Sequence, residues 1–220
     1  MIASLRTESD IELTKLDVIC AMDAAYSKKY GGVGVAIIYD KTSKRVKDIG
    51  IAVGEAPIPY IPGLLAFREA PLLYTAYYTV KQWEPNLIII DGHGIAHPRR
   101  AGIATHIGVA LGKPSIGVAK KRLYGKETEV RGRKILVDPE TNERLAIIIE
   151  RPGRRKLYIS PGNIVKLETA AKIIIDLLDE EHKLPIPLYY ADKISKRIAR
   201  DLDRGKYTPS SLKRRLEDWL

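Results

Sequence analysis

The sequence predicts an α/β fold in which a mixed sheet carries helices on both faces. Three strand-like segments come first and are joined by short polar turns, as in an antiparallel meander. Short apolar strands then alternate with helical segments, which is typical of parallel strands that are buried on both faces. Hydrophobic residues make up 45% and charged residues 29% of the 220 residues, the composition of a soluble globular protein. At this length we expect one domain that spans residues 1–220.

The first half of the chain supplies the antiparallel part. Apolar strands are predicted over residues 16–26, 33–39 and 46–53. Gly31–Gly34 lies between two of them and opens no helix, so we interpret it as a hairpin turn rather than a phosphate-binding loop. Residues 56–63 are too rich in proline for a helix or a central strand and predict a rigid extended loop. A helix is predicted over residues 64–82, in which Pro71 either introduces a kink or begins the second half.

The second half supplies the remaining strands and helices. Strands are predicted over residues 86–90 and 115–119, and between them a helix that Pro98 opens and Pro114 ends. We predict a later hairpin over residues 145–160 and a helix capped by Asn163 over residues 164–178. Two basic helices are predicted over residues 188–200 and 210–220. Three antiparallel strands followed by helix, strand, helix and strand match the ribonuclease H-like architecture.

The charge of the chain points to a polyanionic partner. Lys and Arg number 37 against 27 Asp and Glu, which gives a formal net charge of +10, so nucleic acid is the first partner to consider. Basic residues gather in 120–134 and 151–156; such runs are often only a solvated face, but beside a metal site they suit a phosphate backbone. We expect no membrane partner, because no apolar run is long enough to span a bilayer. The single Cys20 cannot form an internal disulfide, so we expect a cytoplasmic protein.

Acidic residues at strand ends are the strongest chemical signal. Asp91 follows an apolar strand and Asp23 interrupts another, and a buried carboxylate is costly unless it is paired or bound to metal. Converging carboxylates would suit Mg²⁺, which prefers oxygen ligands. The alternatives are a cap or turn role for Asp91 and a bulge or edge position for Asp23. Glu69 and Asp192, taken alone, are equally typical of exposed salt-bridge residues.

Two other features have competing interpretations. His93 and His97 are four residues apart, as in some zinc sites, but Pro98 and the neighbouring glycines prevent one helix from presenting both rings. We therefore favour a turn histidine and a capping or substrate-contacting histidine over zinc. The proline-rich loop presents Tyr60 and Ile61 on a stiff stalk, which could enter a base stack. The alternative is that Tyr60 packs on the core.

Three motifs in order resemble the endonuclease V family. They are Pro-Tyr-Ile-Pro-Gly-Leu-Leu-Ala-Phe-Arg-Glu (59–69), Asp-Gly-His-Gly-Ile-Ala-His-Pro-Arg (91–99) and Ile-Gly-Val-Ala-Lys (116–120) with Leu123 behind it. The similarity covers nearly the whole chain and weakens before about residue 12 and after about residue 203. Only three Asn and one Gln occur, which favours a thermophilic or archaeal-like member of the family.

The resemblance implies a ribonuclease H-like fold and a phosphodiesterase that depends on Mg²⁺, with Mn²⁺ as a substitute. Such an enzyme recognises deoxyinosine in DNA and hydrolyses the second phosphodiester bond on its 3′ side, leaving 3′-hydroxyl and 5′-phosphate ends, in DNA repair. By motif position, the metal ligands would be Asp23, Glu69 and Asp91. Asp192 would help a second metal or the attacking water, and Lys120 would lie at the reaction centre.

The same resemblance implies a wedge and a base pocket. Pro59, Tyr60, Ile61 and Pro62 would fill the gap left by the displaced base. The pocket for hypoxanthine would be shaped by Gly63, Leu65, Gly92, His97, Gly117 and Leu123. Three alternatives stay open: an endoribonuclease acting on inosine-containing RNA, a structure-directed nuclease such as a junction resolvase, and a damage-binding protein without catalysis. We expect a monomer.

Overall fold

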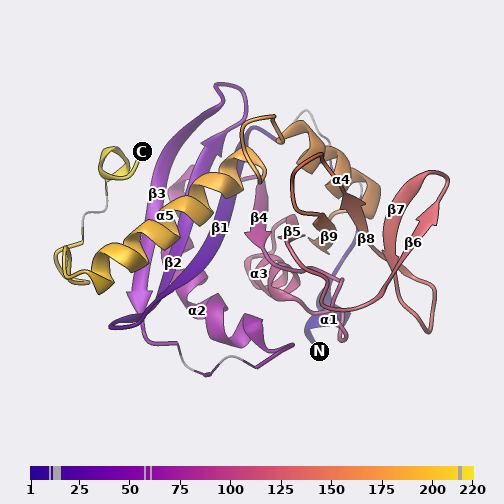
Figure 1. Ribbon diagram of the computed structural model, residues 1–220, viewed down its shortest axis with the longest axis horizontal. Coiled ribbons are helices and arrows are strands. Elements are labelled where there is room, and N and C mark those ends of the chain that lie inside the picture. Colours follow the sequence, from indigo (N-terminus) through magenta and orange to yellow (C-terminus); the bar gives the residue numbers. More distant parts are fainter. Residues whose placement is uncertain (10, 12–15, 57, 60, 213–214) are drawn as a thin grey trace.

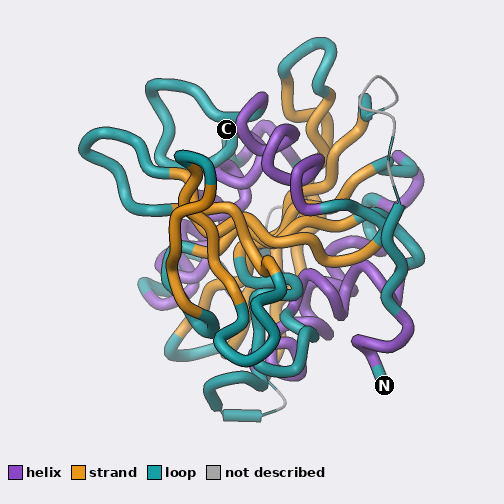
Figure 2. The backbone as a smooth tube through the Cα atoms, turned by 90° about the vertical axis from the view of Figure 1, so that its right-hand side faces the viewer, coloured by secondary structure: helices purple, strands orange, loops and turns teal. Residues whose placement is uncertain are grey.

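A mixed sheet forms the centre of the molecule. The computed structural model describes residues 1–9, 11, 16–56, 58–59, 61–212 and 215–220. Within these residues one sheet contains nine strands in the order β3-β2-β1-β4-β5-β9-β8-β7-β6 (Figure 1). Helices lie on both sides of the strand layer, as the view turned by 90° also shows (Figure 2). The predicted fold class is confirmed.

The elements have the following bounds. The strands are β1 (Val18–Ser27), β2 (Gly31–Asp40), β3 (Arg45–Gly54), β4 (Leu87–Asp91), β5 (Ser115–Ala119), β6 (Lys126–Val130), β7 (Arg133–Val137), β8 (Arg144–Ile149) and β9 (Leu157–Asn163). The α-helices are α1 (Ile2–Leu5), α2 (Leu65–Tyr78), α3 (Ile103–Leu111), α4 (Leu167–Asp176) and α5 (Ile186–Asp203). Two 3₁₀ turns, η2 (Lys81–Trp83) and η3 (Leu216–Asp218), complete the described elements. None of the described helices is long and apolar enough to cross a membrane.

The first three strands form the predicted antiparallel meander, with one difference at the glycines. β1 pairs with β2 and β2 with β3, both antiparallel. The glycine-rich segment belongs to β2 itself, and the turn consists of residues 28–30. Helix α2 packs so closely on β2 that a Cβ atom on Gly34 would lie 2.7 Å from the backbone of Leu72. These glycines therefore allow a helix to approach the sheet, which a turn interpretation did not anticipate.

Parallel pairing in the middle of the sheet brings three strand ends to one edge. β1 pairs with β4 and β4 with β5, both parallel. The last register pair between β1 and β4 is Met22 with Ile90, so the next residue on each strand is an aspartate. The carboxyl ends of parallel strands meet at the same edge, which is where ligands bind in open α/β sheets.

The two faces of the sheet are buried by different helices. Side chains alternate along a strand, so Ile19 and Ala21 of β1 face α5, whereas Cys20 and Met22 face α2 and α3. Figure 1 shows α5 crossing in front of β1–β3 with α2 on the far side. This alternation decides which helix each site residue of β1 meets.

The structure corrects several predicted elements. Residues 126–137 form the hairpin of β6 and β7, although the sequence indicated only a basic run there. The helix after β4 begins at Ile103 rather than Pro98. The N–H of Arg100 donates to the carbonyl of His97 and closes a turn over residues 98–100, and the N–H groups of Gly102 and Ala104 donate to the carbonyls of Gly94 and His93.

The predictions for the later helices are also partly wrong. Asn163 does not cap α4, because it lies in β9 and its amide oxygen accepts a hydrogen bond from the N–H of Thr7 at 3.0 Å. The expected helix over 210–220 is reduced, in its described residues, to the 3₁₀ turn Leu216–Asp218. The other basic helix is confirmed and is longer than predicted, from Ile186 to Asp203.

Candidate active site

Two aspartates meet at the carboxyl end of the parallel strands. Asp23 lies within β1, one residue beyond the last register pair with β4, and Asp91 is the last residue of β4. Both occupy the strand positions whose side chains face α5, because Ala21 and Ile89 of the same strands pack in that core. The parallel ladder therefore sets the two carboxyl groups side by side.

Helix α5 adds a third carboxylate. Its buried face, which includes Ile194, Ile198 and Leu202, packs on the sheet and turns Asp192 toward the other two aspartates. One carboxylate oxygen from each of Asp23, Asp91 and Asp192 lies within 4.8 Å of the others, and no other such cluster occurs among the described residues. The structure thus brings together three of the acidic residues that the sequence singled out.

Lys120 lies between two of these carboxylates. It is the first residue after β5, and its ammonium group donates to Asp192 Oδ1 at 2.5 Å and to Asp91 Oδ2. Lys196, one turn along α5, donates to the same oxygen of Asp192 at 2.7 Å. Burial alone would lower the pKa of Lys120, but the two aspartates raise it above its ordinary value. The lysine therefore carries a fixed positive charge in the middle of the site.

The electrostatics of the cluster favour a bound cation. Burial, followed by the charge of Asp91, raises the pKa of Asp23 well above its ordinary value, although the hydroxyl of Ser195 donates to this carboxylate and acts in the opposite direction. Ion pairs with Lys120 and Lys196 instead lower the pKa of Asp192 against the effect of its burial. Oxygens of three carboxyl groups converge here, and burial and the neighbouring carboxylates disfavour the charged form of Asp23; a hard divalent cation would favour that form. The acidic triad can therefore hold a metal ion.

Glu69 reaches the site from the opposite face of the sheet. It lies in α2, it is only 8% exposed, and its Oε1 accepts a hydrogen bond from the hydroxyl of Tyr26 at 3.1 Å. Burial, with a contribution from Asp91, raises the pKa of Glu69 to about 7. Arg68 stacks on the ring of Tyr26 with its Cζ 4.3 Å from the ring centroid, and so fixes that tyrosine in place. Asp91 is thus close enough to raise the pKa of Glu69, but Glu69 does not belong to the triad.

The two histidines occupy separate places and do not form a zinc site. His93 Nε2 lies 2.9 Å from the carbonyl of Lys121, and burial lowers the pKa of this ring to about 4. His97 Nδ1 accepts from the N–H of Arg99 at 3.1 Å, which leaves Nε2 to donate to the carbonyl of Gly63 at 3.2 Å. Each ring therefore ties two loops together through backbone groups.

A cavity of about 440 Å³ opens beside His97. It lies between the amino-terminal ends of α2 and α3, and its lining includes Gly63, His97, Phe67, Arg99 and His106. The ring of Phe67 is 56% exposed and meets His106 edge-on, with 5.3 Å between ring centroids. Two residues of the predicted base pocket are therefore brought together at one cavity, whose walls combine aromatic and polar side chains with the aliphatic residues Met1–Ala3.

The other residues of the predicted pocket and wedge have different positions. Gly117 lies so close to the loop after β4 that a Cβ atom there would be 2.5 Å from Gly92 O, so these two glycines shape the loop rather than line the cavity. Leu65 begins α2, and Leu123 is 41% exposed on the loop after Lys120. Pro59, Ile61 and Pro62 of the wedge are exposed, while Tyr60 lies outside the described residues.

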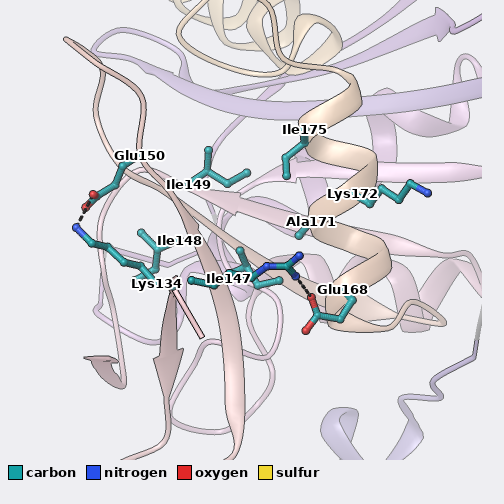
Figure 3. Close-up of a pocket in the computed structure, with 11 residues that line it drawn as sticks. Lys134, Ile147, Ile148, Ile149, Glu150, Glu168, Ala171, Lys172 and Ile175 are labelled. Carbon is teal, nitrogen blue, oxygen red and sulfur yellow. Dashed lines mark hydrogen bonds and ion pairs between the residues drawn. The ribbon is translucent and has the colours of Figure 1, made fainter. Parts of the chain in front are cut away.

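A larger cavity of about 670 Å³ lies elsewhere, between α4 and the strands β7 and β8 (Figure 3). Its walls include Ile147, Ile149 and Ile175, and an ion pair of 2.6 Å joins Lys134 to Glu150 at its rim. None of the predicted site residues lines it. Volume alone therefore does not locate the chemistry of this protein.

Sequence reasoning missed two residues that hold the site in place. Ser195 is three residues after Asp192, a spacing that puts both on one face of a helix, and this was the available signal. Tyr26 is three residues after Asp23 in β1 and therefore faces the opposite side of the sheet, toward Glu69. Each residue supports a carboxylate from its own face.

Comparisons with known proteins agree on one family. The family model described as Endonuclease V matches residues 1–193. Among curated relatives, the endonuclease V of Desulfurococcus amylolyticus is 39% identical over 199 residues, which cover 89% of this chain and 88% of that protein.

Solved structures agree with the sequence comparison. The endonuclease V of Bacillus subtilis superposes with a TM-score of 0.83 at 28% identity and covers 94% of this chain and 90% of its own. The endonuclease V of Ciona intestinalis, in complex with a 24mer DNA that contains an inosine followed by a ribo-adenosine, gives 0.82 at 25% identity and covers 91% and 94%.

Proposed function

This chain belongs to the endonuclease V family, and on that premise we propose that it recognises deoxyinosine in DNA and cuts the strand on the 3′ side of the lesion. The bond hydrolysed is the second phosphodiester 3′ to the deoxyinosine, and the products carry 3′-hydroxyl and 5′-phosphate ends. The observation that carries the proposal is the triad of Asp23, Asp91 and Asp192 around the Lys120 ammonium. DNA repair is the process that such a cut would serve.

The triad would hold Mg²⁺, with Mn²⁺ as a substitute, and Glu69 would complete the ligand set from α2. When bound, such an ion polarises the scissile phosphate, activates water and neutralises the leaving oxygen. Asp23 and Asp91 orient their oxygens toward one point because adjacent parallel strands end there. Ser195 restricts the rotation of the Asp23 carboxyl group, which keeps that orientation.

Lys120 has two tasks in this proposal. Without substrate, its ammonium group forms ion pairs with Asp91 and Asp192 and offsets their negative charge. If Asp91 and Asp192 hold a metal ion instead of the lysine, the Lys120 ammonium would be free to contact a phosphate oxygen or to orient water. Its raised pKa keeps it protonated for both tasks at neutral pH.

The cavity beside His97 is proposed to receive the extruded base. Gly63 and His97 line it, the exposed ring of Phe67 offers a stacking surface, and its volume of about 440 Å³ falls in the range of small-molecule sites. Extrusion costs least at a mispaired base, which adds selectivity. Leu65, Gly92, Gly117 and Leu123 would position the loops around this cavity.

The wedge would fill the space that the base leaves. Pro59, Ile61 and Pro62 are exposed beside α2, as a wedge requires, and Tyr60 between them would enter the base stack. Replacing Tyr60 by Ala should reduce discrimination for inosine and leave the metal site intact. Equal preference for inosine in this variant would remove Tyr60 from the wedge.

The proposal extends to the organisation of the chain. The nine strands form one continuous sheet across the described residues, which supports a single domain over residues 1–220. We propose that the protein acts as a monomer in the cytoplasm. Sedimentation of the protein alone and with substrate tests the monomer.

The experiment that tests the function uses an end-labelled duplex with one deoxyinosine. We expect a single nick at the second phosphodiester 3′ to the lesion with Mg²⁺ or Mn²⁺, and none with EDTA or in a matched duplex with deoxyadenosine. Cleavage of an inosine-free branched duplex would instead identify a structure-directed nuclease. Lesion binding without any cut would identify a binding protein.

A second candidate function is cleavage of inosine-containing RNA. The Ciona intestinalis enzyme was crystallised with a ribonucleotide directly after the inosine, which favours testing ribose at that position. An RNA duplex and a chimera with one ribonucleotide after the deoxyinosine provide the comparison. Faster cleavage of RNA than of DNA would make RNA the substrate.

A further inference from the structure

A basic groove runs along α5 next to the acidic triad. Its volume is about 630 Å³, and the end of β1 with Tyr26 forms one wall. The other wall is α5, with Tyr189, Asp192, Lys193, Lys196 and Arg200. Because Asp192 belongs to both, the groove begins where the triad ends.

Helical periodicity puts the positive charges of α5 in line. Lys193, Lys196 and Arg200 are spaced as i, i+3 and i+7, so they share the exposed face of the helix. Seven residues of α-helix span about 10 Å, and a B-form strand carries a phosphate per roughly 3.4 Å of axis. The row of charges therefore has the length of about three phosphates.

These charges are available for a polyanion. Among the described residues neither Lys193 nor Arg200 forms an ion pair with a carboxylate, and Lys196 is 57% exposed although it pairs with Asp192. The second carboxylate of the groove, Asp203, accepts hydrogen bonds from the hydroxyl of Ser27 at 2.7 Å and from the N–H of Lys28 at 2.8 Å. Its negative charge is thus compensated locally rather than by the row on α5.

An aromatic ring accompanies the charges. The Lys193 ammonium lies 5.7 Å from the centre of the Tyr189 ring, whereas the ring of Tyr26 lies on the other face of the sheet, where its hydroxyl donates to Glu69. Cations combined with an aromatic ring along a groove are typical of sites for a nucleic-acid strand. The groove thus fits a sugar–phosphate strand better than an acidic peptide.

The groove and the base cavity lie on opposite faces of the sheet. The cavity is formed by α2 and α3, which cover one face, whereas the groove follows α5, which covers the other. The triad lies at the edge between them. A strand with its extruded base in the cavity and its scissile phosphate at the triad would continue into the groove.

We propose that the α5 groove binds the phosphates of the cut strand on the 3′ side of the cleaved bond. The inference rests on the proposed function, because the 3′ position of the cut fixes the direction of the strand. The groove would then hold the 5′-phosphate product after hydrolysis. Lys193 and Arg200 bind the substrate away from the bond that breaks.

The test compares two double variants that change charge equally. Lys193→Glu/Arg200→Glu alters the groove, and Lys44→Glu/Arg45→Glu alters exposed residues at the β2–β3 turn, at the opposite end of these strands. With the deoxyinosine duplex, we expect the groove variant to raise KM about tenfold or more with kcat within about twofold. A plot of log(1/KM) against the logarithm of the salt concentration should have a slope that is shallower by about two in the groove variant. The reason is that about one ion is released for each phosphate that a basic side chain neutralises. The control should behave as wild type.

Shortened substrates then test the direction. Removing nucleotides on the 3′ side of the cut should raise the KM of the wild type. It should also abolish the difference in KM between the wild type and the groove variant. Removing nucleotides on the 5′ side of the lesion should preserve that difference. The milder Lys193→Gln/Arg200→Gln variant should show a smaller shift of the same kind, and it substitutes if the glutamates disturb folding.

The outcomes separate the inference from the function. A wild type that cuts the duplex, with a groove variant that matches the control, overturns the inference alone. A difference that survives removal of the 3′ nucleotides also overturns it. A wild type that cuts no inosine-containing substrate overturns the proposed function and the inference with it.

Discussion

Asp23 and Asp138 are both nearly inaccessible to solvent, at 6% and 4% exposure, yet their surroundings shift the two carboxyl pKa values in opposite directions. Asp138 follows β7 and accepts hydrogen bonds from the guanidinium of Arg100, the hydroxyl of Tyr124 and the N–H groups of Glu140 and Thr141. The Arg100 guanidinium and these other donors hold its pKa well below the usual range.

Asp23 has far fewer donors. Its described side-chain partners are one hydroxyl and two other carboxyl groups, and burial raises its pKa. The contrast separates two uses of a buried aspartate. Where hydrogen-bond donors surround the carboxylate, it organises a loop. Where other carboxylates surround it, the group lowers the stability of the fold, and a bound cation can offset that loss.

The largest expected effect comes from Asp23→Asn. It removes one carboxylate of the proposed metal site without changing size, so we expect cleavage to fall at least about 10³-fold, since the loss of metal assistance costs several kcal/mol. Lesion binding in EDTA should persist, and the free energy of unfolding of the metal-free protein should not fall, because a like charge is removed. Single-turnover cleavage and urea unfolding are the measurements. Undiminished cleavage would remove Asp23 from the metal site.

Lys120→Met should have the next largest effect on cleavage, a loss of about 10²–10³-fold. The same change should tighten Mn²⁺ binding, because the ammonium no longer occupies Asp91 and Asp192. Calorimetric titration with Mn²⁺ measures this without a substrate. Unchanged or weaker Mn²⁺ binding would show that lysine and metal do not share these oxygens.

Glu69→Gln tests the electrostatic cost of the site through pH. The folded protein raises the pKa of Glu69 from 4.5 to about 7, so between these values the folded state binds more protons than the unfolded state. Stability in EDTA should therefore fall as pH rises from 4.5 to 7, by up to about 3 kcal/mol for this group. Glu69→Gln has no carboxyl group to titrate at this position and lacks this loss of stability. The free energy of unfolding of the variant minus that of the wild type should therefore increase from pH 4.5 to pH 7. A pH-independent difference would contradict the raised pKa.

Asp138→Asn completes the comparison with the smallest expected effect on cleavage, within about twofold. It should lower Tm by several degrees, because the amide nitrogen that replaces Oδ2 cannot accept the hydrogen bonds of Arg100 and Tyr124, and Arg100 loses a charged partner. Thermal unfolding with and without Mg²⁺ checks this, and stabilisation by Mg²⁺ should be the same as in wild type. A loss of cleavage at full stability would assign Asp138 a role in the site.

Local sequence pattern determined much of this protein. Apolar runs and turns predicted the antiparallel strands, the buried β4 and β5, and the hairpin of β8 and β9, because these features depend on neighbouring residues. The same pattern failed for β6, whose Lys-Glu-Thr-Glu-Val segment is too polar to indicate a buried face, and for β7, whose buried Ile135 and Leu136 follow Arg133 and Lys134 of the basic run. The long helix α5 was predicted from its basic face and Asp192 was named from the family resemblance, but Ser195, which the same helix brings to Asp23, was not predicted.

The sequence by itself determined that Asp23 and Asp91 stand at strand positions where a carboxylate needs a partner. Only the tertiary structure decided which partners they meet. Parallel pairing of β1 with β4 sets the two aspartates side by side, and α5 contributes Ser195 to Asp23 across 172 residues of chain. Strand alternation then sends Tyr26 to Glu69 on the far face. Such meetings depend on packing between distant segments, and no local run of residues encodes them.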